Sequence, residues 1–405
     1  VERTLSDFPL LSLTYAGLDK VKNELLRAVG AASFDDVEDI YPCSPMQQGL
    51  LLSQMRKSGL YEVAFTFEVI SSQPRAPVEV EKFLFAWQKV VDRHAILRTV
   101  FVDSVSKEGL FDQLVLRRIA TRTVRKVFAG ADTEALAALG EQEPMDYSKA
   151  RPPHQLTVCQ TASGKVFCKL EISHAIIDAT SRQVLLRDLN LAYEGVLPSS
   201  LGMLYSDYIK YIQDRPYAIA MEFWKEYLAG VQPCVFPLSS EGTIEARQLK
   251  SMDIDLNLMP GRLRAFCDST GVTVSTVLKT VWALILRCYT SSDQVCFGYL
   301  TSGRDIAING IEDTIGPFIN MLVCYMDMRA TSQIKQLVKQ VQVDYLAGLE
   351  YQHCSLAQIQ YGLNLSGGPL FNTAMSIQRM PSDNAEQQST LSFHGVGGHD
   401  PTEVR

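Results

Sequence analysis

The sequence lacks three features that would place it in a familiar class at once. Its nine cysteines match neither a CxxC pattern nor the spacing of a zinc site, so we expect free thiols and no metal centre. No run of about 18 apolar residues occurs, so we expect no membrane-spanning helix. The net charge is −7 and the basic residues are scattered, so we expect no nucleic-acid surface.

The rest of the composition is typical of a globular chain from a reducing compartment. The 405 residues are 46% hydrophobic and 20% charged, which supplies apolar material for two to three domains. The N-terminus has no signal-like apolar segment and no initiator Met, so we expect a cytoplasmic fragment of a longer polypeptide, monomeric when isolated. Six cysteines lie among apolar neighbours and are predicted to be buried: Cys43, Cys159, Cys168, Cys288, Cys296 and Cys324.

The order of predicted elements indicates two α/β lobes after a linker at 1–17. GVLPSSLG at 195–202 separates the lobes, which we place at 18–200 and 201–405. In the first lobe the pattern predicts helices over 18–30 and 181–194, and a further helix that begins at Pro45 with Ser44 as its cap. It predicts strands over 61–70 and 165–173, and a helix that passes into a strand over 77–102. In the second lobe it predicts strands over 251–256 and 293–302 and helices over 260–270 and 273–290.

EISHAIIDATS at 171–181 contains the best candidate for a catalytic side chain, His174. A histidine after an apolar strand is more often structural than catalytic, but three features favour catalysis. His174 stands where the strand ends and a loop begins, Asp178 follows four residues later, and the next helix presents N-terminal amides that could bind an oxyanion. Histidine also suits proton transfer near neutral pH.

This stretch resembles the HHxxxDG signature of the condensation domains of nonribosomal peptide synthetases. Ser173 replaces the first histidine of the signature and Ala179 replaces its glycine. Further family motifs follow in the family's order, so that the resemblance covers nearly the whole chain. They are YPCSPMQQGLL at 41–51, RHAILRTVF at 93–101, YIQDR at 211–215, GYLTSGRD at 298–305, IGPFINML at 315–322, YQHCSLAQIQ at 351–360 and PLFNTAMSIQ at 369–378.

The SHxxxDxxS variant resembles the terminal condensation-like domains of fungal synthetases, of the fumiquinazoline type, which release a peptide as a macrocycle. The resemblance implies two chloramphenicol-acetyltransferase-like lobes in a V-shaped pseudo-dimer, with the active site at their interface. It implies a substrate carried as a thioester on the phosphopantetheine arm of an upstream peptidyl carrier domain in the same polypeptide, to which the linker 1–17 would lead. No cofactor bound by the domain itself and no metal are expected.

The resemblance also implies roles for individual residues. His174 would be the general base. Asp178 is interpreted as a scaffold of the loop rather than a second acid or base, paired with the guanidinium of Arg304, or alternatively with that of Arg98. Ser173 is interpreted as a structural residue in preference to a catalytic hydroxyl.

A second group of residues is assigned to substrate contacts. The backbone N–H of Ala179 is a candidate donor to the thioester carbonyl, and Ser181 is a candidate for the same oxyanion site or for the tunnel. Asn320 and Gln378 are candidates for the tunnel lining by resemblance alone.

Three rival functions remain open. An elongating condensation domain would use a second carrier-bound amine as acceptor, and the Ser-His variant argues against it. An epimerisation domain shares the signature but exchanges a proton at Cα without releasing a product. A non-catalytic carrier-docking module would bind without turnover, and the intact His174 and Asp178 count against that interpretation.

Overall fold

The computed structural model describes residues 3–73, 76–106, 109–140, 150–237, 252, 254, 260–329, 333–364, 368–378 and 389–400. The chain divides into two compact units. Unit 1 consists of residues 1–214, 307–318 and 381–403, and unit 2 consists of residues 215–306, 319–380 and 404–405. The units interleave along the chain, whereas the predicted lobes are contiguous; the lobe boundaries at 18–200 and 201–405 stay a prediction.

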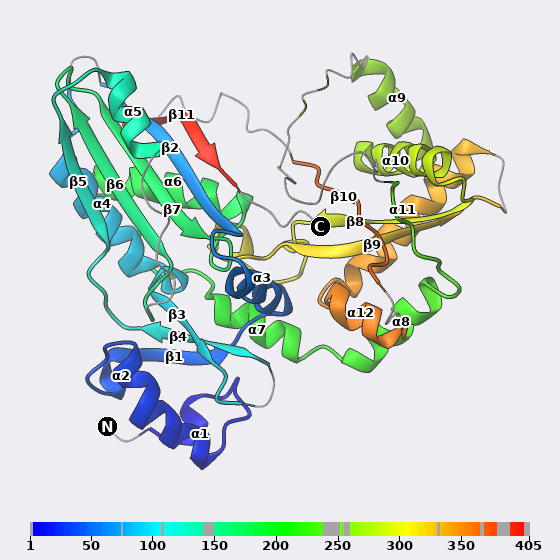
Figure 1. The fold of residues 1–405 in the computed structure, drawn as a ribbon, viewed down its shortest axis with the longest axis horizontal. Helices are drawn as coiled ribbons and strands as arrows, with labels where there is room; N and C mark the ends of the chain where they lie inside the picture. The colour runs from blue at the N-terminus through cyan, green and yellow to red at the C-terminus, as the bar shows by residue number, and fades with distance from the viewer. Residues whose placement is uncertain are drawn as a thin grey trace. The chain divides into compact units, whose positions relative to one another are not determined.

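Unit 1 is built around a mixed five-stranded sheet in the order β11-β2-β7-β6-β5. β7 lies in the centre and pairs antiparallel with both β2 and β6, while β5 runs parallel to β6. β11, drawn in red, returns from the C-terminal part of the chain and pairs along β2 (Figure 1). The strands are β2 (Glu62–Ser71), β5 (Thr123–Phe128), β6 (His154–Thr161), β7 (Val166–Ser173) and β11 (Leu391–His399).

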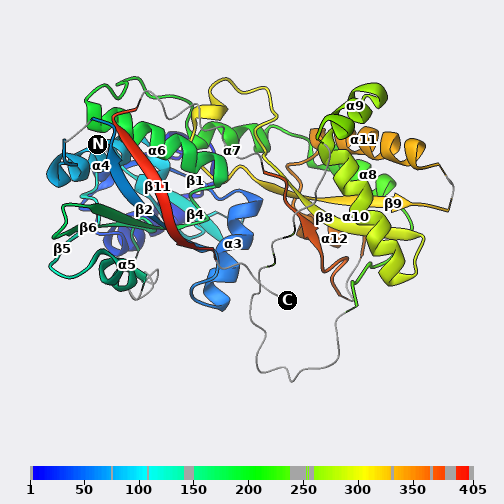
Figure 2. The same ribbon diagram turned by 90° about the horizontal axis from the view of Figure 1, so that it is seen from above.

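Helices cover both faces of this sheet. α4 and α6 lie side by side on one face, and α5 lies on the other (Figure 2). The helices of the unit are α1 (Tyr15–Lys20), α2 (Leu26–Ala28), α3 (Pro45–Arg56), α4 (Val80–Arg93), α5 (Asp132–Gly140), α6 (Ala179–Glu194) and α7 (Tyr205–Gln213), with short helical turns at Leu5–Asp7, Val21–Leu25, Phe34–Asp36, Ala95–Arg98 and Ile311–Asp313.

Local sequence signals explain where these helices begin and which faces they bury. Ser44 caps α3 by accepting a hydrogen bond from the Gln47 amide, and Pro45 occupies the first helical position, as predicted. α4 buries one apolar face, on which Phe83, Ala86, Trp87, Val90 and Val91 are all shielded from solvent.

A smaller antiparallel sheet of unit 1 has the order β1-β4-β3, formed by β1 (Val37–Pro42), β3 (Thr99–Asp103) and β4 (Phe111–Leu116). It packs with the N-terminal segment into one hydrophobic cluster that includes Phe8, Leu11 and Leu13. Residues 3–17 therefore contribute to the core of unit 1, although the sequence pattern predicts an irregular linker there. Their connection to an upstream carrier domain stays a prediction.

Unit 2 has a three-stranded sheet in the order β10-β8-β9, surrounded by helices. Its core is apolar and aromatic, with Trp224 and Phe297 completely buried. The elements are α8 (Tyr217–Tyr227), α9 (Pro260–Thr270), α10 (Val274–Thr290), β8 (Gln294–Thr301), β9 (Asn320–Asp327), α11 (Ile334–Glu350), α12 (Leu356–Gly362) and β10 (Ala374–Met375).

The predicted burial of six cysteines is confirmed for five of them and wrong for Cys288. Cys288 is exposed, contrary to expectation, because it lies two residues after the buried Leu286 and so on the opposite face of α10. The other five cysteines predicted to be buried are buried. The strand predicted over 251–256 lies almost entirely outside the described residues.

The described residues contain no single helix of sufficient length and apolarity to cross a membrane. A pair bent by 98°, Gly261–Thr270 with Val274–Thr290, reaches the required length and apolarity only together.

Candidate active site

His174 is the first residue after β7, the central strand of the larger sheet. Every residue of β7 is buried, including Lys169 and Glu171, whose side chains pair at 3.1 Å. The His174 backbone N–H donates to the Tyr61 carbonyl at the start of β2, which extends the strand pairing up to the loop. The imidazole therefore projects from the end of a rigid strand, and the His174 side chain is 19% exposed.

The orientation of the imidazole is fixed by the loop. Its Nδ1 lies 3.2 Å from the Ile177 carbonyl oxygen, which can only accept a hydrogen bond. Nδ1 therefore carries a proton and Nε2 is the nitrogen that points away from the backbone. The Tyr61 ring packs edge-on, with its centroid 6.5 Å from that of the imidazole.

The side chain of Asp400, the residue after β11, reaches Nε2 of His174 at 3.1 Å. Burial lowers the pKa of His174, but the hydrogen bond and charge of Asp400 together with the Ile177 carbonyl outweigh burial and raise that pKa above its usual value. The hydrogen bond from His174 conversely lowers the pKa of Asp400. Asp400 belongs to none of the family motifs, so the sequence does not single it out.

Asp178 is buried and holds two segments of backbone together. One carboxylate oxygen caps α6 by accepting from the Ser181 amide at 2.7 Å, and the other accepts from the Phe318 amide at 3.1 Å. Both contacts are to backbone amides, and the scaffold role interpreted from the sequence stays a prediction. Arg304 belongs to unit 2, so its pairing with Asp178 stays a prediction, and Arg98 contacts Glu38 at 2.6 Å.

Ser173 is completely buried at the end of β7. Its hydroxyl oxygen accepts from the Ala175 amide at 3.1 Å and from the Gln54 side chain at 3.0 Å. The hydroxyl is thus engaged in holding the loop.

The residues predicted to contact the substrate lie in different parts of the chain. Ala179 is exposed at the first position of α6, while the buried Ser181 hydroxyl donates to the Gly316 carbonyl at 2.8 Å and accepts from the Gly316 amide at 3.0 Å. Asn320 begins β9 and Gln378 is exposed after β10, both in unit 2. Their roles at an oxyanion site or tunnel stay predictions.

A buried pair of glutamine side chains holds the loop that follows β7 by a hydrogen bond to its backbone. Gln47 and Gln113 donate to each other at 2.9 and 3.0 Å, and the second N–H of Gln47 donates to the Ala175 carbonyl at 2.9 Å. In the sequence, Gln47 is recognisable only as a member of the opening motif at 41–51. Nothing local in the sequence indicates its contact with a loop so far along the chain.

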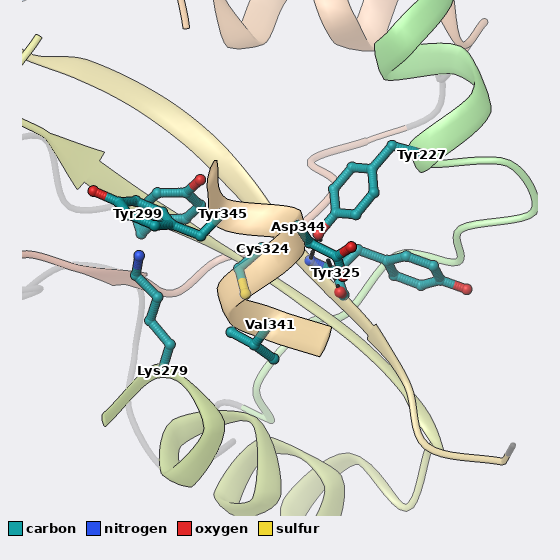
Figure 3. A pocket seen from close by; sticks show the side chains of 8 residues that line it. All are labelled: Tyr227, Lys279, Tyr299, Cys324, Tyr325, Val341, Asp344 and Tyr345. Atoms are coloured by element: carbon teal, nitrogen blue, oxygen red, sulfur yellow. Dashed lines mark hydrogen bonds between the residues drawn. The ribbon is translucent and has the colours of Figure 1, made fainter. Parts of the chain in front are cut away.

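Unit 2 contains a second cluster of polar side chains around a small pocket (Figure 3). The buried Lys279 ammonium lies 4.0 Å from the ring centroid of Tyr299 and 3.6 Å from that of Tyr345. Burial lowers the pKa of Lys279 to about 8. The lysine is held between aromatic rings of the core and lies outside the matched histidine motif, so we assign it a structural role.

The family follows from comparison with known proteins. A family model described as condensation domain matches residues 37–400. The chain belongs to the condensation domain family. This match confirms the predicted family. Because condensation domains of nonribosomal peptide synthetases form amide bonds, it also confirms the predicted enzyme class, and solved structures with the same fold confirm the predicted α/β fold.

Curated relatives of this condensation domain are large fungal synthetases. Nonribosomal peptide synthetase 1 of Aspergillus fumigatus is 40% identical over 403 residues, which is 99% of this chain and 6% of that protein. Nonribosomal peptide synthetase 4 of Gibberella zeae is 44% identical over 383 residues, 94% of this chain and 5% of that protein. The chain thus spans only a small fraction of these relatives.

Solved structures share its fold at low sequence identity. A protein described as CT has a TM-score of 0.70 and 18% identity, over 97% of this chain and 86% of its own. The condensation domain of the monacolin K polyketide synthase MokA has a TM-score of 0.69 and 14% identity, over 91% of this chain and 88% of its own.

Proposed function

We propose that this condensation domain releases a peptide as a macrocycle, with His174 as the general base. The substrate is a peptidyl thioester on the phosphopantetheine arm of an upstream peptidyl carrier domain, and an amine of the same peptide is the nucleophile. The observation that carries the proposal is the histidine itself. Nδ1 is anchored on the Ile177 carbonyl, which leaves Nε2 of this partly exposed imidazole as the nitrogen directed away from the backbone.

Because a thioester is already activated, the protein has only to position the attacking amine and to transfer its proton. The amine nitrogen bonds to the thioester carbonyl carbon, and its proton passes to Nε2 of neutral His174. When the tetrahedral intermediate collapses, the C–S bond breaks and the imidazolium returns the proton to the departing thiolate. The domain must hold the amine near the carbonyl and exclude water that would hydrolyse the acyl group.

The Ser-His form of the signature favours release over chain elongation. In the resembled family this form marks domains that end a peptide chain. Ser173 is buried and its hydroxyl is engaged with the Ala175 amide, so we assign it a structural role even in this branch. An elongating condensation domain, which uses a second carrier-bound amine, is the alternative function.

The test is a release assay with a peptidyl thioester loaded on a carrier domain and with products identified by mass spectrometry. His174→Ala should slow macrocycle formation at least about 100-fold, since general-base catalysis contributes that much or more. His394→Ala removes an exposed histidine of β11 and serves as the matched control, with an unchanged rate.

Two outcomes would contradict the proposal in different ways. Undiminished cyclisation by His174→Ala would remove the histidine from the chemistry. Amide formation only when a second aminoacyl-loaded carrier is supplied, with no macrocycle in its absence, would establish the elongating alternative.

A further inference from the structure

The proposed base is held by two hydrogen-bond acceptors at once, and this determines its protonation state. The Ile177 carbonyl faces Nδ1 at 3.2 Å and the Asp400 carboxylate faces Nε2 at 3.1 Å. A neutral imidazole has one N–H, so its other nitrogen would direct a lone pair at an acceptor. Only the doubly protonated imidazolium satisfies both contacts.

An imidazolium cannot accept the proton of an attacking amine. Nε2 is the nitrogen that the proposed mechanism requires, and Asp400 occupies its hydrogen-bonding direction. The amine and the carboxylate therefore compete for the same position beside the ring. In the substrate-free domain, the contact with Asp400 therefore holds His174 as the imidazolium, which cannot act as a base.

The charged and titratable groups around this contact reinforce it. Asp178, at the start of α6, adds a negative charge that favours the imidazolium, and the Tyr61 ring lies edge-on beside the histidine. The pKa of Asp400 is in turn lowered by its hydrogen bond from His174 and by electrostatic interactions with His174, His399 and Arg182. Asp400 is 57% exposed, so it can leave the histidine without breaking a packed core.

We propose that Asp400 is a positioning residue that latches His174 as an imidazolium in the substrate-free domain, and that acyl transfer starts only after the carboxylate has left Nε2. When the latch opens, the imidazolium gives its Nε2 proton to solvent and becomes the neutral base. Binding of the peptidyl thioester beside Nε2 displaces Asp400. The inference rests on the proposed role of His174 as base.

The experiment measures the His174 titration and the rate independently in the 405-residue chain. Histidines are labelled with 13C, and the signal missing from His174→Ala identifies His174 in the NMR titration. In Asp400→Asn the pKa of His174 should fall by about 1 unit. Amide formation at pH values below that pKa should then rise about tenfold, with an unchanged plateau at high pH.

Asp19→Asn removes one exposed carboxylate on α1 and serves as the matched control, with no effect on either measurement. A His174 pKa that is the same in Asp400→Asn and in the unsubstituted chain would overturn the latch. A plateau rate lowered by Asp400→Asn would also overturn it, because the carboxylate would then assist catalysis rather than delay it. If His174→Ala still cyclises, the proposed function fails, whereas the NMR titration still decides whether the latch exists.

Discussion

Replacement of Asp178 by Ala should destabilise unit 1 rather than act on the reaction alone. The substitution removes two hydrogen bonds to a buried carboxylate, from the Ser181 amide at 2.7 Å and from the Phe318 amide at 3.1 Å. Hydrogen bonds to charged groups contribute about 1.5–3 kcal/mol each, so we expect unit 1 to lose about 3–6 kcal/mol of unfolding free energy. Asp178→Asn keeps one acceptor oxygen and should lose about 1–3 kcal/mol.

Urea unfolding followed by circular dichroism measures this loss. With an m value of about 2 kcal/mol/M, Asp178→Ala should lower the unfolding midpoint of unit 1 by about 2 M. Asp103→Ala, at an exposed strand end, should stay within about 0.5 kcal/mol of the unsubstituted chain. If Asp178→Ala unfolds at the same urea concentration as the unsubstituted chain yet no longer forms the amide, the scaffold role of Asp178 is wrong, since the carboxylate would then act in the chemistry.

Two further predictions concern Ser173 and Lys279. Ser173→Ala should lose about 1–2 kcal/mol of unfolding free energy, because the Ala175 amide loses its acceptor, while the rate of amide formation per folded molecule stays within a few-fold; a large rate loss at unchanged stability would make the hydroxyl catalytic. The pKa of Lys279 is about 8 in the folded chain and about 10.4 in an unfolded one, so the unfolded state binds more protons between these values and stability should rise with pH from about 8 to 10. Lys279→Met should abolish that rise in urea titrations across this pH range, and an unchanged rise would show that another group causes it.

The parts of the fold that follow from neighbouring residues were predictable. The cap of α3 at Ser44 depends on a residue three positions away, and the buried face of α4 depends on helical periodicity, so both are encoded within a few residues. Cys288 shows the limit of local composition, because apolar neighbours in the sequence do not decide which face of α10 a side chain occupies. The N-terminal segment shows it too, because the burial of Phe8 depends on a sheet formed much later in the chain.

The candidate site divides in the same way. The sequence by itself determined the family and the position of His174 at the end of a strand, because each of these depends on contiguous stretches of the chain. Only the tertiary structure decided what surrounds that motif. Gln47 lies 128 residues from Ala175, Ser181 lies 135 residues from Gly316, and Asp400 lies 226 residues from His174. The last two contacts arise because the segment at 307–318 and β11 return to unit 1, and no periodicity or spacing within the motif specifies where the chain returns.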